Sequence, residues 1–131
     1  MAQHPNVELL RKALDAFSRG DLDTVRSLWA DDIVYHFSGA SPLAGDYKGK
    51  DGVLSYFAKA VELAGGTLRM VEVHDVLAND EHAVALLRAT GSRKGKQYEA
   101  REVDVFHFKD GRIIEFWSFS EDQRMTDEFW S

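Results

Sequence analysis

The sequence predicts a single α+β domain spanning residues 1–131, with three N-terminal helices packed on a strongly curved antiparallel sheet and a central pocket between them. Apolar residues recur at helical spacing in the first half of the chain, whereas β-type segments dominate the second half. One predicted strand, Tyr98–Lys109, spans about 12 residues, near the upper limit for a strand, and such strands bend. With 131 residues and 44% hydrophobic composition, the chain can bury the core of one domain.

Two helices are predicted first. Apolar residues at helical spacing over residues 7–17 indicate the first helix, with Asn6 as its N-cap and Gly20 as its stop. Asp21 then caps a short second helix, whose apolar face ends at Trp29.

A strand and a third helix follow. Ile33–Phe37 is β-branched and aromatic, which favours a strand. The segment Ser38–Lys50 holds three glycines and Pro42, so we expect a loop with a short extended piece. Asp51 opens the third predicted helix, and Gly65-Gly66 closes it.

The second half of the chain is predicted to be a meander of four strands that ends in a helix. Asp110-Gly111 is the strongest hairpin signal, because these residues accept the positive φ angles of a type I′ turn, and Arg93–Lys96 is a weaker one. Ser120 and Gln123 have the spacing of a capping box, which predicts a helix over Glu121–Phe129. The predicted strands are Thr67–His74, Ala83–Thr90, Tyr98–Lys109 and Arg112–Ser120.

Period-two alternation divides the longest strand into two faces. One face carries Glu102, Asp104, Phe106 and Phe108, and the other carries Arg101, Val103, Val105 and His107. Both faces hold substantial apolar area, so we expect one to cover the core and the other to form a homodimer interface. In the alternative, the terminal helix covers the outer sheet face.

Composition and motifs exclude several classes of function. The net charge of −6 disfavours binding to nucleic acid or to anionic membranes, and the chain has no cysteine. No apolar run approaches the roughly 20 residues that cross a bilayer, and the first residues lack a signal-peptide pattern, so a cytoplasmic location is expected. The histidines lack metal-binding spacing, and no phosphate-binding glycine motif occurs, so no metal and no cofactor are predicted.

Several segments together resemble one known superfamily. Gly20-Asp21-Leu22-Asp23, Leu28–Asp32 and the strand Ile33–Phe37 resemble the opening of the nuclear transport factor 2-like superfamily. Ser41–Gly49 and Val105–Trp117 are similar to its SnoaL-like group, which includes polyketide cyclases and relatives of ketosteroid isomerase. The resemblance implies a cone-shaped α+β barrel with one deep pocket per subunit and frequent dimers. It leaves the reaction open, because this fold hosts isomerases, cyclases, hydrolases, dehydratases and transport factors.

The resemblance also suggests positions for a site. The isomerases' general base falls on His36, and their protonated aspartic acid, which stabilises an enolate, matches Asp104. Their helix-borne tyrosine aligns with Ala13, which disfavours steroid isomerisation. The last aspartate of the related epoxide hydrolases falls close to Ser118, which disfavours that chemistry as well.

His36 and Asp104 are therefore the predicted catalytic residues. An imidazole exchanges protons near neutral pH, and a neighbouring aspartate would fix its tautomer. Alternatively, the two form a buried pair that only satisfies its own hydrogen bonds. Glu102 could share a proton with Asp104, and Arg88 could hold a ligand carboxylate. The predicted ligand-binding residues are Phe17, Trp29, Tyr56, Phe57, Met70, Arg88, Glu102, Phe106 and Ser118.

Two functional hypotheses follow from these residues. The first is a cofactor-independent enzyme of isomerase, cyclase or hydratase type, using acid–base chemistry on a small apolar carbonyl or hydroxyl compound. The second is a non-catalytic module, in which the same pocket binds a small molecule or the domain serves as a dimeric interaction partner.

Overall fold

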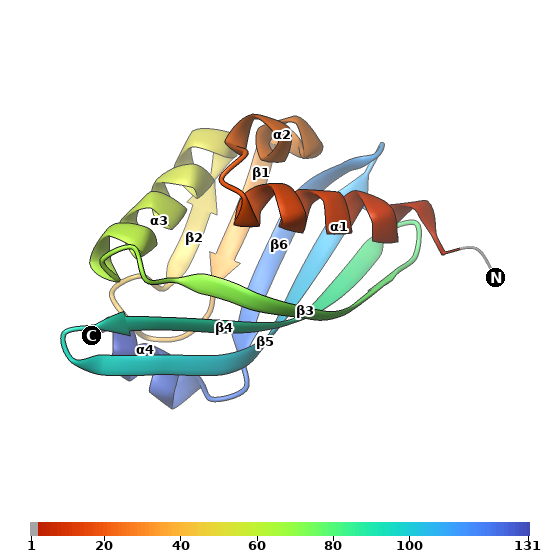
Figure 1. The fold of residues 1–131 in the computed structure, drawn as a ribbon. Coiled ribbons are helices and arrows are strands. Elements are labelled where there is room, and N and C mark those ends of the chain that lie inside the picture. The colour runs from red at the N-terminus through yellow and green to blue at the C-terminus, as the bar shows by residue number, and fades with distance from the viewer. Residues whose placement is uncertain (1–2) are drawn as a thin grey trace.

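The computed structural model describes residues 3–131, which form four helices and six strands (Figure 1). The predicted α+β architecture is confirmed, with three helices in the first half of the chain and one at the end. The elements are α1 (Pro5–Ser18), α2 (Leu22–Leu28), β1 (Trp29–Phe37), β2 (Gly45–Lys48), α3 (Gly49–Leu63), β3 (Arg69–Ala78), β4 (His82–Arg93), β5 (Lys96–Lys109), β6 (Arg112–Ser120) and α4 (Gln123–Trp130).

The six strands form one curved sheet in the order β2-β1-β6-β5-β4-β3. Strands β3 to β6 make the predicted antiparallel meander. Strand β1 pairs with β6 in parallel. The sequence had predicted an antiparallel sheet, so this one pair of strands departs from the prediction. This pairing brings the first and last strands of the chain side by side in the middle of the sheet (Figure 1).

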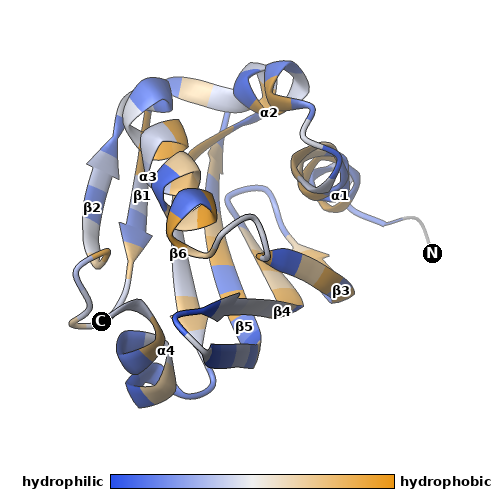
Figure 2. Ribbon diagram, turned by 60° about the vertical axis from the view of Figure 1, so that its left-hand side comes forward, coloured by the Kyte–Doolittle hydropathy of each residue, from blue (hydrophilic) through white to orange (hydrophobic). Residues whose placement is uncertain are grey.

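Helices α1 and α3 lie over the same face of the sheet, and α4 lies at its far end (Figure 2). α1 contacts β3 and β4, while α3 contacts β1 and β2. The buried side chains of α1 recur every three residues, because this spacing keeps them on one side of a helix. The core therefore lies between these helices and the inner, concave sheet face. None of the helices within residues 3–131 is long and apolar enough to cross a membrane.

The N-cap of α1 is His4 rather than the predicted Asn6. Pro5 occupies the first helical turn, where its missing N–H costs nothing, and the His4 side chain accepts a hydrogen bond from the backbone of Asn6. The side-chain amide of Asn6 instead donates to the backbone oxygens of Asn79 and Asp80, which ties the helix start to the β3–β4 turn. Tertiary contacts therefore override the local capping signal.

Two other predicted boundaries are wrong. Trp29 is the first residue of β1 rather than the end of α2, and it is buried. The strand register shifts between Trp29 and Val34, so the intervening exposed aspartates are a bulge within β1. Helix α3 begins at Gly49, and Asp51 lies in its first turn, where it accepts a hydrogen bond from Arg26.

The type I′ hairpin signals are confirmed. Asp110 and Gly111 have φ angles of 52° and 75°, and Lys94 and Gly95 have 52° and 77°. Positive φ at both central residues matches the right-handed twist of the flanking strands. The two tight turns thus set the register of β4, β5 and β6.

The predicted capping box before α4 does not form. Asp122 is the N-cap, and its side chain accepts from the backbone N–H of Met125. Gln123 is the first helical residue, and its side chain reaches the backbone oxygen of Ser38 and the carboxylate of Asp127. The helix starts two residues later than predicted because Asp122 provides the cap.

Candidate functional site

A strip of polar side chains crosses the otherwise apolar inner face of the sheet. Asp104 lies on β5, directly opposite Ser118 of β6 and Ala85 of β4. Only 9% of Asp104 is exposed, and within residues 3–131 its Oδ1 atom has no hydrogen-bond partner. A buried carboxyl oxygen without a partner is costly, and such atoms mark sites where a ligand or a water molecule binds.

Ser118 connects Asp104 to the first strand. The buried Tyr35 hydroxyl donates to Ser118 Oγ over 2.8 Å. The two residues meet because Tyr35 pairs with Phe116 across the parallel β1–β6 ladder, one pleat from Ser118. Burial raises the pKa of Tyr35 well above its ordinary value, so its hydroxyl keeps its proton and can donate.

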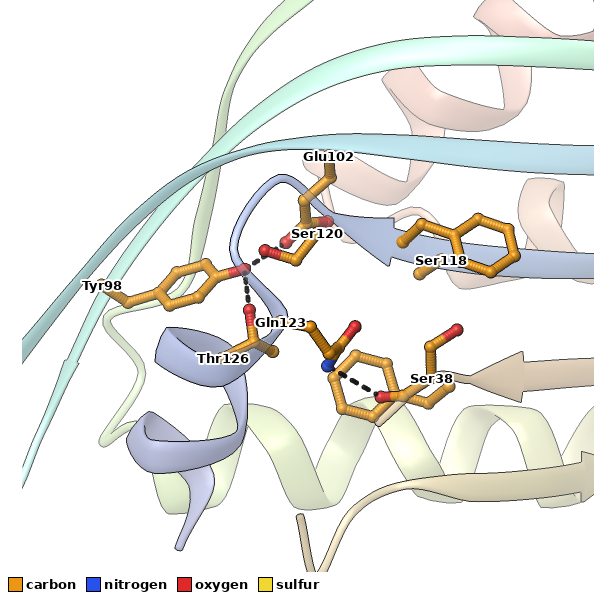
Figure 3. A pocket seen from close by; sticks show the side chains of 9 residues that line it. Ser38, Tyr98, Glu102, Ser118, Ser120, Gln123 and Thr126 are labelled. Carbon is orange, nitrogen blue, oxygen red and sulfur yellow. Dashed lines mark hydrogen bonds between the residues drawn. The ribbon is translucent and has the colours of Figure 1, made fainter. Parts of the chain in front are cut away.

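A second polar group follows on the same face of β5. Glu102 lies two residues before Asp104, and its Oε1 accepts a hydrogen bond of 2.8 Å from the Tyr98 hydroxyl (Figure 3). The Tyr98 hydroxyl also lies 3.3 Å from Thr126 Oγ1 of α4. This chain of contacts extends the polar strip from Asp104 toward the C-terminal helix.

The two carboxyl groups differ in electrostatic environment. Burial raises the pKa of Asp104 well above its ordinary range, the neighbouring Glu102 raises it further, and the Ser118 hydroxyl opposes the shift. Burial also raises the pKa of Glu102, but the hydrogen bond from Tyr98 lowers it in part. Because two adjacent carboxylates repel each other, the pair retains a proton, and Asp104 is the better place for it.

Aromatic rings surround this polar strip. Tyr35 lies 4.9 Å from Tyr56 and 5.4 Å from Phe57, measured between ring centroids. Phe106 stacks on Phe116 at 5.4 Å. Of the other predicted ligand-binding residues, Phe17 contacts Phe57, Trp29 packs near Phe116, and Met70 packs against the core.

These side chains fill most of the space between helices and sheet. The open space at the polar strip is a cavity of about 10 Å³, room for roughly one water molecule. It is lined by Phe37, Ser38, Tyr98, Glu102, Ser118, Phe119, Ser120, Gln123 and Thr126 (Figure 3). A larger open groove of about 270 Å³ runs between α1 and β3, away from the carboxyl pair. At the polar strip, the predicted central pocket is thus reduced to this small cavity.

His36 lies on the opposite face of the sheet from Asp104, so the two predicted catalytic residues do not meet. His36 pairs with Trp117 and Asp104 pairs with Ser118, and consecutive residues of a strand point to opposite faces. The imidazole lies between two carboxylates, with Nδ1 2.6 Å from Asp46 Oδ1 and Nε2 2.6 Å from Glu115 Oε2.

This outer-face arrangement fits a charged histidine. A neutral imidazole has one N–H, whereas an imidazolium donates to both carboxylates. Desolvation lowers the pKa of His36, but the hydrogen bonds to Asp46 and Glu115 outweigh it, and the net pKa is raised. His36 also stacks on Trp117 at 5.0 Å. It therefore clamps β2, β1 and β6 together on the outer face.

Arg88 also lies on the outer face, not in the pocket. It pairs with Arg101 of β5 and donates to Glu99 Oε1 over 2.8 Å. Arg88 therefore has a surface charge partner, as residues of this type on a sheet often do.

Sequence reasoning missed two members of the polar strip, Tyr98 and Thr126. The signal for Tyr98 was present, because it shares the period-two phase of Glu102 and Asp104. Thr126 carried no such signal, since its contact with Tyr98 depends on how α4 folds back on the sheet.

Residues 10–116 match the family model of the SnoaL-like domain. An uncharacterized protein of Mycobacterium tuberculosis is 33% identical over 132 residues, covering 100% of both chains. The solved structure of Bal32a, from a soil-derived mobile gene cassette, is 33% identical, covers 96% of each chain and has a TM-score of 0.90.

Two more distant structures share the fold. TerC, co-crystallized with polyporic acid, is 18% identical with a TM-score of 0.83, covering 96% of this chain and 98% of its own. IdmH of Streptomyces antibioticus, a candidate polyketide cyclase, is 22% identical with a TM-score of 0.74, covering 94% and 96%.

Proposed function

This chain belongs to the SnoaL-like domain family, and on that premise we propose that it is a cofactor-independent acid–base enzyme acting on a small apolar carbonyl compound. The observation that carries the proposal is the buried Oδ1 of Asp104 on the concave sheet face, which has no hydrogen-bond partner among residues 3–131. Family membership and the polyporic acid with which TerC was co-crystallized support a small organic ligand, and IdmH, a candidate polyketide cyclase, supports a cyclase type of reaction.

Asp104 acts as the acid in this proposal. Burial raises its pKa and favours the neutral carboxyl, whose O–H can donate a hydrogen bond to a carbonyl oxygen. The hydrogen bond strengthens as negative charge develops on that oxygen. A donor that is already oriented and shielded from water stabilises the transition state without reorganisation.

Glu102 acts as the base. Glu102 loses its proton at a lower pH than Asp104, since the Tyr98 hydrogen bond stabilises the charged form of Glu102. In the reaction we propose, Glu102 takes a proton from the carbon next to the carbonyl, and the enolate oxygen accepts the hydrogen bond from Asp104. Return of the proton to another carbon of the enolate completes an isomerisation, with no net gain or loss of atoms.

The experiment begins with native mass spectrometry of gently purified protein, followed by denaturing analysis of whatever is released. Cyclic ketones chemically related to the released compound are then incubated in D₂O, and deuterium uptake next to the carbonyl is measured by NMR. We expect Asp104→Ala to slow the exchange by about 10²–10³-fold, because alanine has no side-chain donor and one oxyanion donor is lost. Asp32→Ala, at an exposed position of β1, is the matched control. Full activity of Asp104→Ala would contradict the proposal.

The second candidate function is a small-molecule-binding module without catalysis. It is favoured by the closed interior, because aromatic side chains occupy the space in which a substrate would lie. In that case the released compound rebinds, and it is recovered unchanged after prolonged incubation.

We also propose that the outer sheet face forms a homodimer. Val103 and Phe119 lie directly opposite each other on β5 and β6, and they are 39% and 44% exposed. Leu77 of β3 is 54% exposed. Apolar patches of this kind are sites of protein association. Phe119→Asp should convert a dimer into a monomer in analytical ultracentrifugation, and a monomeric parent protein would contradict the interface.

A further inference from the structure

We propose that ligands reach Asp104 through the small cavity between the β1–β2 loop (residues 38–44) and α4, and that Gln123 and Asp127 latch this port shut. The inference rests on the proposed function, because it takes Asp104 to be the group that faces the ligand. It adds the route of access and the residues that control it.

The position of the cavity is the first argument. It is bounded by Glu102 and Ser118, the two polar neighbours of Asp104, and on its outer side by Ser38 and Gln123 (Figure 3). A molecule entering between the loop and α4 would thus meet the polar strip before the aromatic core. The cavity has room for only about one water molecule, so the loop must move before anything larger can enter.

The latch consists of three hydrogen bonds. Gln123 Nε2 donates to the backbone oxygen of Ser38 over 3.2 Å and to Asp127 Oδ1 over 3.1 Å. The same Asp127 oxygen accepts from the backbone N–H of Ala40 over 3.1 Å. Two side chains of one helix therefore hold both ends of the Ser38–Ala40 segment.

Gly39 shows how closely the latch fits. A Cβ atom at this position would lie 2.2 Å from Asp127 Oδ1 and 2.3 Å from Gln123 Nε2. The residue also has a φ of +110°, which side chains rarely adopt. Only glycine lets the loop approach α4 this closely.

The loop is the moving part, whereas α4 is anchored. Arg93 donates to the backbone oxygens of Phe129 and Ser131, and Lys96 donates to that of Glu128, so the end of α4 is tied to the β4–β5 hairpin. The loop, by contrast, buries the Ser41 hydroxyl, which has no partner anywhere in the part of the chain that the structure describes. Closure leaves this group unsatisfied, and opening would return it to water.

The test uses the fact that the chain has no cysteine. Ser118→Cys places one thiol in the cavity wall, and its reaction with 4,4′-dithiodipyridine, a small uncharged reagent, is followed by absorbance. We expect Gln123→Ala or Asp127→Ala in this background to raise the labelling rate by about tenfold, since each removes two of the three hydrogen bonds of the latch. Arg124→Ala, on the exposed side of α4, is the matched control and should leave the rate unchanged.

A second thiol separates latch opening from general loosening. Ala85→Cys lies on the inner face at a fully buried position opposite Asp104. Its labelling rate should not respond to the latch variants. Equal acceleration at both thiols, or no acceleration at Ser118→Cys, would overturn the proposal. If Ser118→Cys does not fold, Ser120→Cys gives the same comparison at another position in the cavity wall.

Gly39→Ala provides an independent way to break the latch. We expect it to accelerate labelling at Ser118→Cys, whereas Gly45→Ala should not. Gly45 also has a positive φ, but a Cβ there meets nothing within 4 Å. This control therefore introduces backbone strain without a steric clash between the new Cβ and another element. Labelling requires no chemistry at Asp104, so the rates test the port even if Asp104 proves not to be catalytic.

Discussion

The substitution Asp104→Asn tests whether the central carboxyl group is neutral in the folded protein. Asp104 is 9% exposed and lies opposite Ser118 and Ala85 in the sheet, so asparagine fits the same space without a titratable group. Because the folded state raises the pKa of Asp104, the folded protein binds more protons than the unfolded chain above about pH 4. The free energy of unfolding therefore falls as pH rises.

The magnitude follows from proton linkage. A carboxyl that keeps its proton in the folded state and loses it on unfolding changes the free energy of unfolding by about 1.4 kcal/mol per pH unit. If Asp104 stays protonated throughout, the wild type loses about 2.7 kcal/mol relative to Asp104→Asn between pH 5 and pH 7. Glu102 is present in both proteins, so most of its own contribution cancels.

The assay is urea unfolding of both proteins at half-unit pH steps, with Asp110→Asn as the control for an exposed aspartate. We expect the stability difference to grow with pH for Asp104→Asn and to stay constant for Asp110→Asn. A constant difference for Asp104→Asn from pH 5 to pH 7 would mean that Asp104 ionises normally, and the acid role would be lost.

Three further substitutions test other parts of the structure. The wild type has a stabilisation below about pH 6.5 that it loses as pH rises through the raised pKa of His36, and His36→Gln should remove it. The free energy of unfolding is measured in urea from pH 5.5 to 8.5, with His82→Gln as the control. A pH-independent difference would contradict the ionic clamp. Tyr35→Phe should cost about 1 kcal/mol in the same assay by removing the hydroxyl that donates to Ser118, and a neutral effect would argue against that bond. Phe129→Ala should cost about 3–5 kcal/mol, because this ring of α4 is buried against Tyr98 of β5, and a loss below about 1 kcal/mol would show that α4 is loosely held.

Local signals in the sequence were sufficient for much of the fold. The Asp110-Gly111 turn was predictable because few residues accept two successive positive φ angles. The inner face of β5 was predictable because side chains alternate strictly along a strand, which put Asp104 and Phe106 on one side. Capping was less predictable, since Asn6 and Gln123 exchange their local bonds for tertiary ones.

The face of His36 was decided only by the tertiary structure. β1 carries Tyr35 and His36 side by side, and both types of residue fit a polar pocket or a sheet surface. A shift of one residue in register would exchange them, and the parallel pairing with β6 selects the register. That pairing buries Tyr35 beside Ser118 and sends His36 outward to Asp46.

The order of the elements, the two tight hairpins and the presence of an acid on the inner face of β5 could all be predicted from the sequence. Each of these depends on interactions between residues that are near one another in the chain or on the period of a single strand. Tertiary contacts set the β1–β6 pairing, the bond of Tyr35 to Ser118 beside Asp104, and the hydrogen bonds of Gln123 and Asp127 to the β1–β2 loop. These features join segments about 80 residues apart, and no local pattern records which distant side chains will meet.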